Sequence, residues 1–139
     1  VFSDSLVGHI KGGLGHVNIL SSMFFGGISG SAIADTAAIG GLLIPTMNEE
    51  GYEPSYSAAI TASSSVIGVI IPPSIPFILY GVTTGTSISK LFIGGIIPGI
   101  LTGLILMFVT ALTVSKHKVD KHNGVKRLFS IIQIIKKYL

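Results

Sequence analysis

Residues 17–47 read VNILSSMFFGGISGSAIADTAAIGGLLIPTM, and this stretch decides the fold because a polar Ser-Gly-Ser cluster interrupts an apolar run. The cluster, residues 29–31, separates an apolar segment at 17–28 from a second one at 36–47. A helix of about 12 residues reaches only ~18 Å, whereas the hydrocarbon core of a bilayer is ~30 Å thick. Neither segment is therefore expected to cross a membrane alone.

Two structures are open to this pair of segments. The first is one long helix broken at Gly30, and the second is a re-entrant hairpin that enters and leaves on the same membrane face with the Ser-Gly-Ser cluster at its tip. Gly26, Gly27 and Gly30 crowd the proposed tip, and glycine permits the positive φ values that a tight reversal needs. We therefore predict the hairpin, over about 17–47.

The composition is that of a membrane protein. Of 139 residues, 48% are hydrophobic and 11% are charged, whereas an ordinary soluble domain has about 25% charged residues. No Asp, Glu, Lys or Arg occurs at 54–89 or at 91–115, and both stretches are long enough to cross a bilayer. The sequence predicts an all-α, multi-pass membrane protein.

Beyond the hairpin, the acidic segment 48–54 predicts a loop outside the membrane. Residues 54–82 predict a broken transmembrane helix, because Pro72, Pro73 and Pro76 remove backbone donors and clash with the preceding turn. Residues 89–115 predict an intact transmembrane helix. Tyr52 is typical of an anchor at the membrane interface.

Residues 116–139 predict a basic connector followed by an amphipathic helix that lies in the interface. Seven of the nine Lys and Arg residues fall in this tail, and the turn predicted at 81–87 has none. The positive-inside rule therefore places the tail in the cytoplasm, and the basic charge does not indicate nucleic-acid binding.

Enzymatic and transition-metal chemistry are not expected. The chain has no cysteine, its histidines lack metal-ligand spacing, and none of them lies near a serine cluster to form a hydrolase site. No catalytic residue and no cofactor are predicted.

The two breaks predict an ion site. Non-helical backbone at membrane depth is tolerated only where it is buried in protein or lines a watery cavity, and broken helices expose carbonyls that suit Na⁺. One serine cluster is at 29–31 and the other, Ser63-Ser64-Ser65, lies before the prolines of the second break. We expect the two clusters and their glycines to bind Na⁺. The candidate ligands are Ser29, Gly30, Ser31, Ser64, Ser65 and Gly68. A purely structural role stays open, in which the serines allow close helix packing and Ser31 caps a helix.

The free N–H groups at the starts of half-helices suit an anionic substrate. The candidate substrate-binding residues lie beside the two breaks: Ser31, Asp35, Ser63, Pro72, Pro73 and Ser74. Asp35 is the only acidic residue within the apolar hairpin, and ionisable groups at such depth are usually functional. Its carboxylate could instead stabilise the N-terminus of the second hairpin helix.

Three runs resemble the large membrane subunit of tripartite ATP-independent periplasmic (TRAP) transporters, the DctM-like family. They are GHIKGGLGHVNILSSMFFGGISGSAIADTAAIG, IPTMNEEGYEPSYSAAITASSSVIGVIIPPSIPFILYG and SISKLFIGGIIPGILTGL. The resemblance implies that GISGSAIAD is the tip of the first helical hairpin and that SSSVIGVIIPPS is the broken helix opposite it. It also implies that 1–115 belong to an elevator-type transport domain and 116–139 to the arm that joins it to a scaffold.

By the same resemblance, the function is Na⁺-coupled import of organic acids such as C4-dicarboxylates, sugar acids or sialic acid. The partners would be a periplasmic binding protein and a small membrane subunit, and the location the bacterial inner membrane. Family members also have an inverted second half that this stretch lacks, so it is not expected to transport alone. A non-transporting structural module or an inactive remnant stays open as the alternative.

Overall fold

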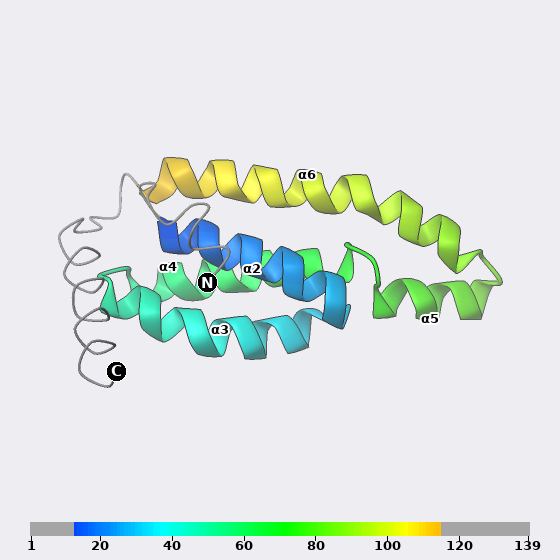
Figure 1. Ribbon diagram of the computed structural model, residues 1–139, viewed down its shortest axis with the longest axis horizontal. Helices are drawn as coiled ribbons and strands as arrows, with labels where there is room; N and C mark the ends of the chain where they lie inside the picture. The colour runs from blue at the N-terminus through cyan, green and yellow to red at the C-terminus, as the bar shows by residue number, and fades with distance from the viewer. Residues whose placement is uncertain (1–12, 115–139) are drawn as a thin grey trace, which may run out of the picture.

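The structure, a computed structural model, describes residues 13–114 (Figure 1). Its elements are α2 (Gly13–Ser29), α3 (Ala32–Glu49), α4 (Pro54–Ser65), the 3₁₀ helix η1 (Val66–Val69), α5 (Ile75–Thr84) and α6 (Ile88–Val114). Within these residues every regular element is helical, which confirms the all-α prediction. The predicted connector and amphipathic helix at 116–139 lie outside the described residues.

The chain reverses direction between α2 and α3, which run antiparallel and pack against each other. Gly30 makes this reversal, since its φ of 63° lies in the left-handed region. Ser31 then starts α3 with an extended backbone, and its side chain accepts a hydrogen bond from the backbone N–H of Ala34. A helix stop and a helix start thus fall on two adjacent residues.

The two hairpin helices are longer than the sequence predicted. They have 17 and 18 residues, so they reach about 25–27 Å instead of the expected ~18 Å. The expected bounds were wrong because α2 continues back through Gly15 and His16, which are buried against the rest of the molecule. Gly30, rather than the shortness of the segments, is therefore the cause of the reversal.

Helix α2 lies at the centre of the bundle. It contacts α3, α4, η1 and α6, and in Figure 1 it runs between α6 and the α3–α4 pair. The core gathers around it, with the buried side chains Ile19, Met47, Tyr52, Ile60, Ile67 and Val114. The hairpin is consequently held on several sides along its length.

Helix α4 begins at Pro54, in the first helical position that suits proline. After η1 the chain leaves helical geometry until α5 begins at Ile75, and Ser74 caps that helix by accepting from Phe77 N–H. The interval 70–74, which contains Pro72 and Pro73, is called the break below.

Helix α5 ends later than predicted. The turn was expected at 81–87, but α5 continues to Thr84 and is closed by Gly85, whose φ is 71°. The hydroxyls of Thr83 and Thr84 donate to backbone carbonyls one turn back. These bonds satisfy the hydroxyls within the helix, so the threonine-rich sequence did not stop it.

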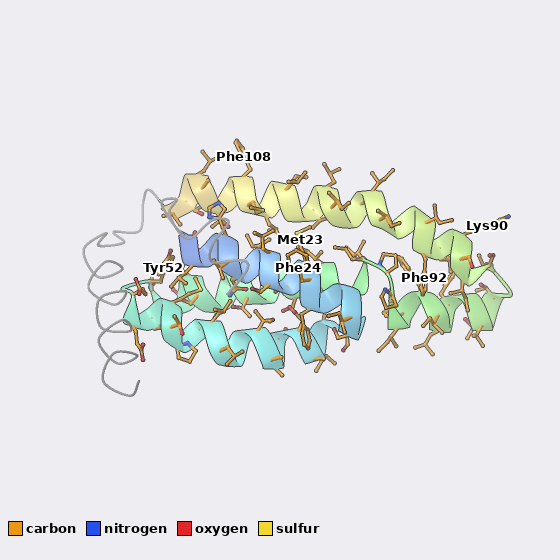
Figure 2. The ribbon with its side chains drawn as sticks, viewed as in Figure 1. Met23, Phe24, Tyr52, Lys90, Phe92 and Phe108 are labelled. Carbon is orange, nitrogen blue, oxygen red and sulfur yellow. The ribbon has the colours of Figure 1, made fainter. Side chains whose placement is uncertain are left out.

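Helix α6 packs through a stripe of glycines. A Cβ added to Gly95 would lie 2.5 Å from the Ile70 carbonyl oxygen, and one added to Gly103 would lie 2.5 Å from the sulfur of Met23. Figure 2 shows Met23 between α2 and α6. Small residues at a four-residue spacing allow membrane helices to approach closely, and here they bring α6 against the break.

The opposite face of α6 is apolar and exposed. Ile97 is 75% and Phe108 66% exposed, and Figure 2 shows Phe108 pointing away from the bundle. Within residues 13–114, α6 is the helix that is long and apolar enough to cross a membrane. Its length agrees with the predicted intact span at 89–115.

Tyr52 is buried at the base of the hairpin, so its predicted role as an interfacial anchor is wrong. Its side chain is only 4% exposed, and its ring stacks on Tyr56 with centroids 6.1 Å apart. Burial raises the pKa of Tyr52 to about 12, although hydrogen bonds with the backbone of Gly15 and Leu14 lower it. The phenol therefore joins the loop before α4 to the start of α2.

Stability at alkaline pH is expected to depend on Tyr52. The pKa is raised from 10.0 to about 12 by folding, so the neutral phenol is favoured in the folded state. The contribution of the buried Tyr52 phenol to the free energy of unfolding should be complete below pH ~10 and should disappear as the pH rises toward ~12. Thermal denaturation of the full protein in detergent, followed from pH 8 to 12, would measure this loss. The Tyr52→Phe variant should lack that part of the pH dependence, and an unchanged profile would contradict the assignment.

Candidate functional site

The tip of the hairpin is docked on the break. The backbone N–H of Ile75 donates to the Gly30 carbonyl at 3.2 Å, and a Cβ added to Gly30 would lie 2.6 Å from the Pro73 carbonyl oxygen. The structure thus brings together the hairpin tip and the break, two segments that are about 40 residues apart in the sequence.

A second contact, one turn below the tip, fixes the hairpin against η1. A Cβ on Gly26 would collide with Gly68 Cα, and a Cβ on Gly68 would lie 3.2 Å from Gly26 Cα. Both residues are buried. Backbone therefore meets backbone at this crossing, and a side chain on either residue would separate the two elements.

Four helix ends converge at this junction. The carbonyl ends of α2 and η1 and the N–H ends of α3 and α5 all lie within a few residues of the Gly30–Pro73 contact. Carbonyl ends carry partial negative charge and N–H ends carry partial positive charge. The arrangement offers oxygen ligands for a cation beside donors for an anion.

The serines at the tip take part in capping. Ser31 N–H donates to Ser29 Oγ at 3.4 Å, and Ser31 Oγ accepts from Ala34 N–H at 3.3 Å. Both residues are partly exposed. The capping role that the sequence left open for Ser31 is therefore present.

Ser64 and Ser65 are buried in α4 but differ in their bonding. Ser64 Oγ donates to Asn18 Oδ1 at 3.1 Å or to the Thr61 carbonyl at 3.1 Å, and it lies 3.0 Å from Ser22 Oγ. Ser65 Oγ donates to the Thr61 carbonyl at 2.8 Å. Of the two predicted ion ligands, Ser64 is surrounded by protein partners, whereas Ser65 keeps acceptor capacity.

Asn18 and Thr61 were missed by the sequence interpretation. Asn18 Nδ2 donates to Thr61 Oγ1 at 2.7 Å and to the sulfur of Met47 at 3.7 Å, and Asn18 is completely buried. The signal was an asparagine inside an apolar run, since buried amides in membrane helices usually hydrogen-bond across helices. This network links α2, α3 and α4 below the junction.

Asp35 lies in the first turn of α3 and is 0% exposed. A Cβ built on Gly68 would lie 4.0 Å from Asp35 Cβ and 3.9 Å from the Ser31 carbonyl oxygen. Among the described residues, neither carboxylate oxygen has a hydrogen-bond partner. Asp35 therefore belongs to the junction, on the side of η1.

The remaining substrate candidates differ in position. Pro72 and Pro73 form the break itself, and Pro73 contacts the tip through its carbonyl. Ser74 is 0% exposed, and its hydroxyl donates to the Val69 carbonyl at 2.6 Å, which closes the break internally. Ser63 is exposed, unlike its buried neighbours Ser64 and Ser65. The structure thus does not bring Ser63 into the junction.

The donors at the junction suit a hard monovalent cation. Within residues 13–114 there is no group of three or more His, Cys, Asp or Glu side chains that could hold a metal ion. The junction instead offers serine hydroxyls, backbone carbonyls and one carboxylate. Such oxygen ligands, with few charges, fit Na⁺ better than a transition metal.

The sequence matches a known family along nearly its whole length. A family model described as "Tripartite ATP-independent periplasmic transporter, DctM component" matches residues 1–137. The chain is 48% identical over 109 residues to the sialic acid TRAP transporter large permease of Vibrio cholerae, covering 78% of this chain and 26% of the relative. It is 53% identical over 102 residues to the 2,3-diketo-L-gulonate TRAP transporter large permease of Escherichia coli, covering 73% and 24%.

A third relative is the C4-dicarboxylate TRAP transporter large permease of Pseudomonas aeruginosa, 44% identical over 108 residues, which are 78% of this chain and 25% of the relative. The chain thus spans about a quarter of the length of these curated relatives, all of which are named as permeases. The chain belongs to the DctM family, the large permease component of tripartite ATP-independent periplasmic transporters.

Proposed function

We propose that this chain forms one wall of the ion and substrate site of a Na⁺-coupled permease for organic acids. The observation that carries the proposal is the docking of the hairpin tip on the break, through Gly30 and Pro73. Non-helical backbone of both elements meets there with helix ends of both signs. The printed names of the relatives include sialic acid, a sugar acid and C4-dicarboxylates, which indicates an organic acid as the substrate class.

In this proposal Na⁺ lies near Ser29, Ser31 and Ser65, with backbone carbonyls from both elements as further ligands. The N–H ends of α3 and α5 face the anionic group of the substrate. Among residues 13–114, Lys90 is the only lysine or arginine, and Figure 2 places it at the far end of the molecule from Tyr52. Cationic partners for the substrate would then come from the rest of the permease.

We extend the proposal to the setting of the whole permease. The permease is integral to the bacterial inner membrane, with the hairpin re-entrant, residues 54–82 as a broken transmembrane helix and the basic tail in the cytoplasm. A periplasmic binding protein delivers the substrate, a small membrane subunit accompanies the large one, and the transport domain moves as an elevator. The charge asymmetry of the sequence supports the orientation of the tail.

Alanine substitutions at the junction test the proposal. Full-length permease with its small subunit, carrying Ser29→Ala, Ser31→Ala or Ser64→Ala, would be reconstituted in liposomes with its binding protein. Na⁺-driven uptake of labelled substrate should fall by about tenfold or more, because each change removes an oxygen ligand or its support. Ser55→Ala is the matched control, since Ser55 is exposed and bonds only to Glu53 within the described residues. Unchanged uptake in all three junction variants would contradict the proposal.

A structural membrane module is the second candidate. The observation in its favour is that Ser64 and Ser74 already have protein partners for their hydroxyls. This candidate predicts that alanine at either position lowers the yield of folded permease, whereas the surviving protein keeps the Na⁺ dependence of the wild type. Yield and Na⁺ dependence measured on the same preparations separate the two candidates.

A further inference from the structure

We infer that an acidic turn at the base of the hairpin binds the basic segment that follows α6 in the same chain. The acidic turn consists of three glutamates around the end of α3: Glu49, Glu50 and Glu53. The basic segment contributes three lysines: Lys116, Lys118 and Lys121. The inference goes beyond the proposed function and does not depend on it, because the contact involves neither the coupling ion nor the substrate.

Negative charge in the described residues is concentrated at the acidic turn. Among residues 13–114, the only other acidic residue is Asp35, which is buried at the junction. Glu49 and Glu53 are exposed, and Glu50 is partly exposed. The base of the hairpin therefore presents a negative surface at one end of the molecule.

Two of these glutamates lie where a helix disfavours negative charge. Helix α3 ends at Glu49, and Glu50 is its C-terminal capping residue. The carbonyl end of a helix carries partial negative charge, so cations stabilise it and carboxylates do not. The last turn of α3 contains no basic residue. A cationic segment bound to the acidic turn would therefore stabilise both the carboxylates and the helix end.

Helix α6 delivers the following chain to the acidic turn. The Thr113 hydroxyl lies 3.0 Å from the Tyr56 hydroxyl, and the Tyr56 ring stacks on Tyr52, which lies within the turn. Val114 is buried in the same cluster as Tyr52. In Figure 1 the C-terminal end of α6 lies at the same end of the molecule as the turn between α3 and α4. The chain therefore leaves α6 beside the acidic turn.

The sequence after Val114 has the complementary charge. It holds seven of the nine Lys and Arg residues and one acidic residue, Asp120. All three lysines of the basic segment fall within seven residues of Val114. An extended chain spans at most ~3.6 Å per residue, so the Cα of Lys116 lies within ~7 Å of the Cα of Val114, and that of Lys121 within ~25 Å. These lysines can reach the acidic turn without any movement of α6.

Several charges must act together, because a single exposed ion pair contributes little. Three carboxylates opposite three ammonium groups form a network, and the basic segment is tethered to α6, so its effective concentration at the turn is high. An anionic membrane surface competes for the same lysines. We favour the acidic turn, since its carboxylates lie where α6 ends and would repel an anionic surface.

Zero-length cross-linking tests the contact directly. Full-length permease with its small subunit would be treated in detergent with a carbodiimide, which joins a carboxylate to an amine only where the two groups touch. Mass spectrometry should find amides between the acidic turn and the basic segment at about 0.01 M KCl, and their yield should fall about fivefold or more at about 1 M KCl, where the screening length is only ~3 Å. Absence of these amides at low salt would overturn the inference.

Trypsin gives a second measurement, since it cleaves after lysine and a bound lysine is protected. A variant that combines Glu49→Gln, Glu50→Gln and Glu53→Gln removes the charge of the turn and keeps its shape. Cleavage within the basic segment should be about fivefold or more faster in this variant than in the wild type. The matched control replaces the same residues with aspartate, which keeps the charge, and should be cut at the wild-type rate. Equal rates for the wild type and the glutamine variant would refute the contact.

Lipid composition distinguishes the acidic turn from the membrane surface. The same cleavage would be measured in nanodiscs with and without phosphatidylglycerol, and we expect the wild type to be protected in both. Protection that needs the anionic lipid and persists in the glutamine variant would assign the lysines to the membrane and overturn the inference. If the glutamine variant does not fold, cross-linking of the wild type decides alone. Neither measurement uses uptake, so a permease without Na⁺-coupled transport would reject the proposed function and leave this contact standing.

Discussion

Gly26→Ala is expected to abolish Na⁺-driven uptake. The added methyl group would collide with the Cα of Gly68, so the hairpin and η1 would have to separate. Overpacking typically costs about 1–3 kcal/mol, and the upper end applies here because the obstacle is backbone, which cannot rotate aside like a side chain. Because both elements contribute to the junction, even a small separation would spoil its geometry.

The measurement is uptake by reconstituted permease, together with the midpoint of thermal denaturation. Gly27→Ala is the matched control on the same helix, because its Cβ would lie at ordinary contact distances of 3.7 Å from Ile71 and 3.8 Å from the Pro72 carbonyl. The control should transport like the wild type. Equal uptake by Gly26→Ala and Gly27→Ala would show that transport does not need the close Gly26–Gly68 contact.

Asn18→Ala is expected to destabilise the permease by about 1–3 kcal/mol. The change removes the hydrogen bond to Thr61 and the acceptor of Ser64, and it leaves a cavity at a site with 0% exposure. It should also lower the apparent Na⁺ affinity, since Asn18 helps to hold the end of α4 from which Ser64 and Ser65 project. Thermal denaturation and the Na⁺ dependence of uptake would measure the two effects.

Asn18→Leu separates the hydrogen bonds from the cavity, because leucine restores most of the volume without the amide. It should recover less than half of the lost stability if the hydrogen bonds dominate. Thr36→Val serves as the control, since Thr36 is exposed and its hydroxyl bonds only to a carbonyl of its own helix within the described residues. Full recovery in Asn18→Leu would mean that Asn18 acts by filling space.

Much of the fold could be predicted from local chemistry. Gly30 between two serines marked a reversal, Pro54 marked a helix start, and the prolines at 72 and 73 marked a break in the second long segment. Each signal depends on the backbone of a few neighbouring residues. The apolar stretch at 89–115 predicted a long helix for the same reason, and α6 occupies Ile88–Val114.

The errors occurred where tertiary packing overrides a local preference. Residues 13–16, Gly-Leu-Gly-His, were expected to lie outside the helix, but α2 begins at Gly13, and Gly13, Gly15 and His16 are buried. Tyr52 was expected at an interface, but it is buried against Tyr56 and the start of α2. A pattern of polar and apolar residues does not show which polar residues will find partners.

Part of the candidate site could also be predicted from local sequence signals. The sequence indicated that the two serine clusters lie at breaks, and the structure brings one break against the other. It could not show that Ser63 faces outward while Ser64 and Ser65 face inward, which is a matter of helix phase. Nor could it show that the buried carboxylate of Asp35 lacks a hydrogen-bond partner among residues 13–114. Both facts depend on how α3 packs against α4 and η1.

Cysteine accessibility through the hairpin tests the central claim most directly. The chain has no cysteine of its own, so single cysteines can be placed at Leu14, at 26–35 and at Glu49 in cysteine-free permease. We expect the two ends of the hairpin, at Leu14 and Glu49, to react with membrane-impermeant reagents from the cytoplasm. We expect Na⁺ with substrate to protect Ile28→Cys and Ala32→Cys, which flank the proposed ligands Ser29 and Ser31. Labelling of the two hairpin ends from opposite sides of the membrane, or a tip that reacts equally with and without Na⁺ and substrate, would contradict the account.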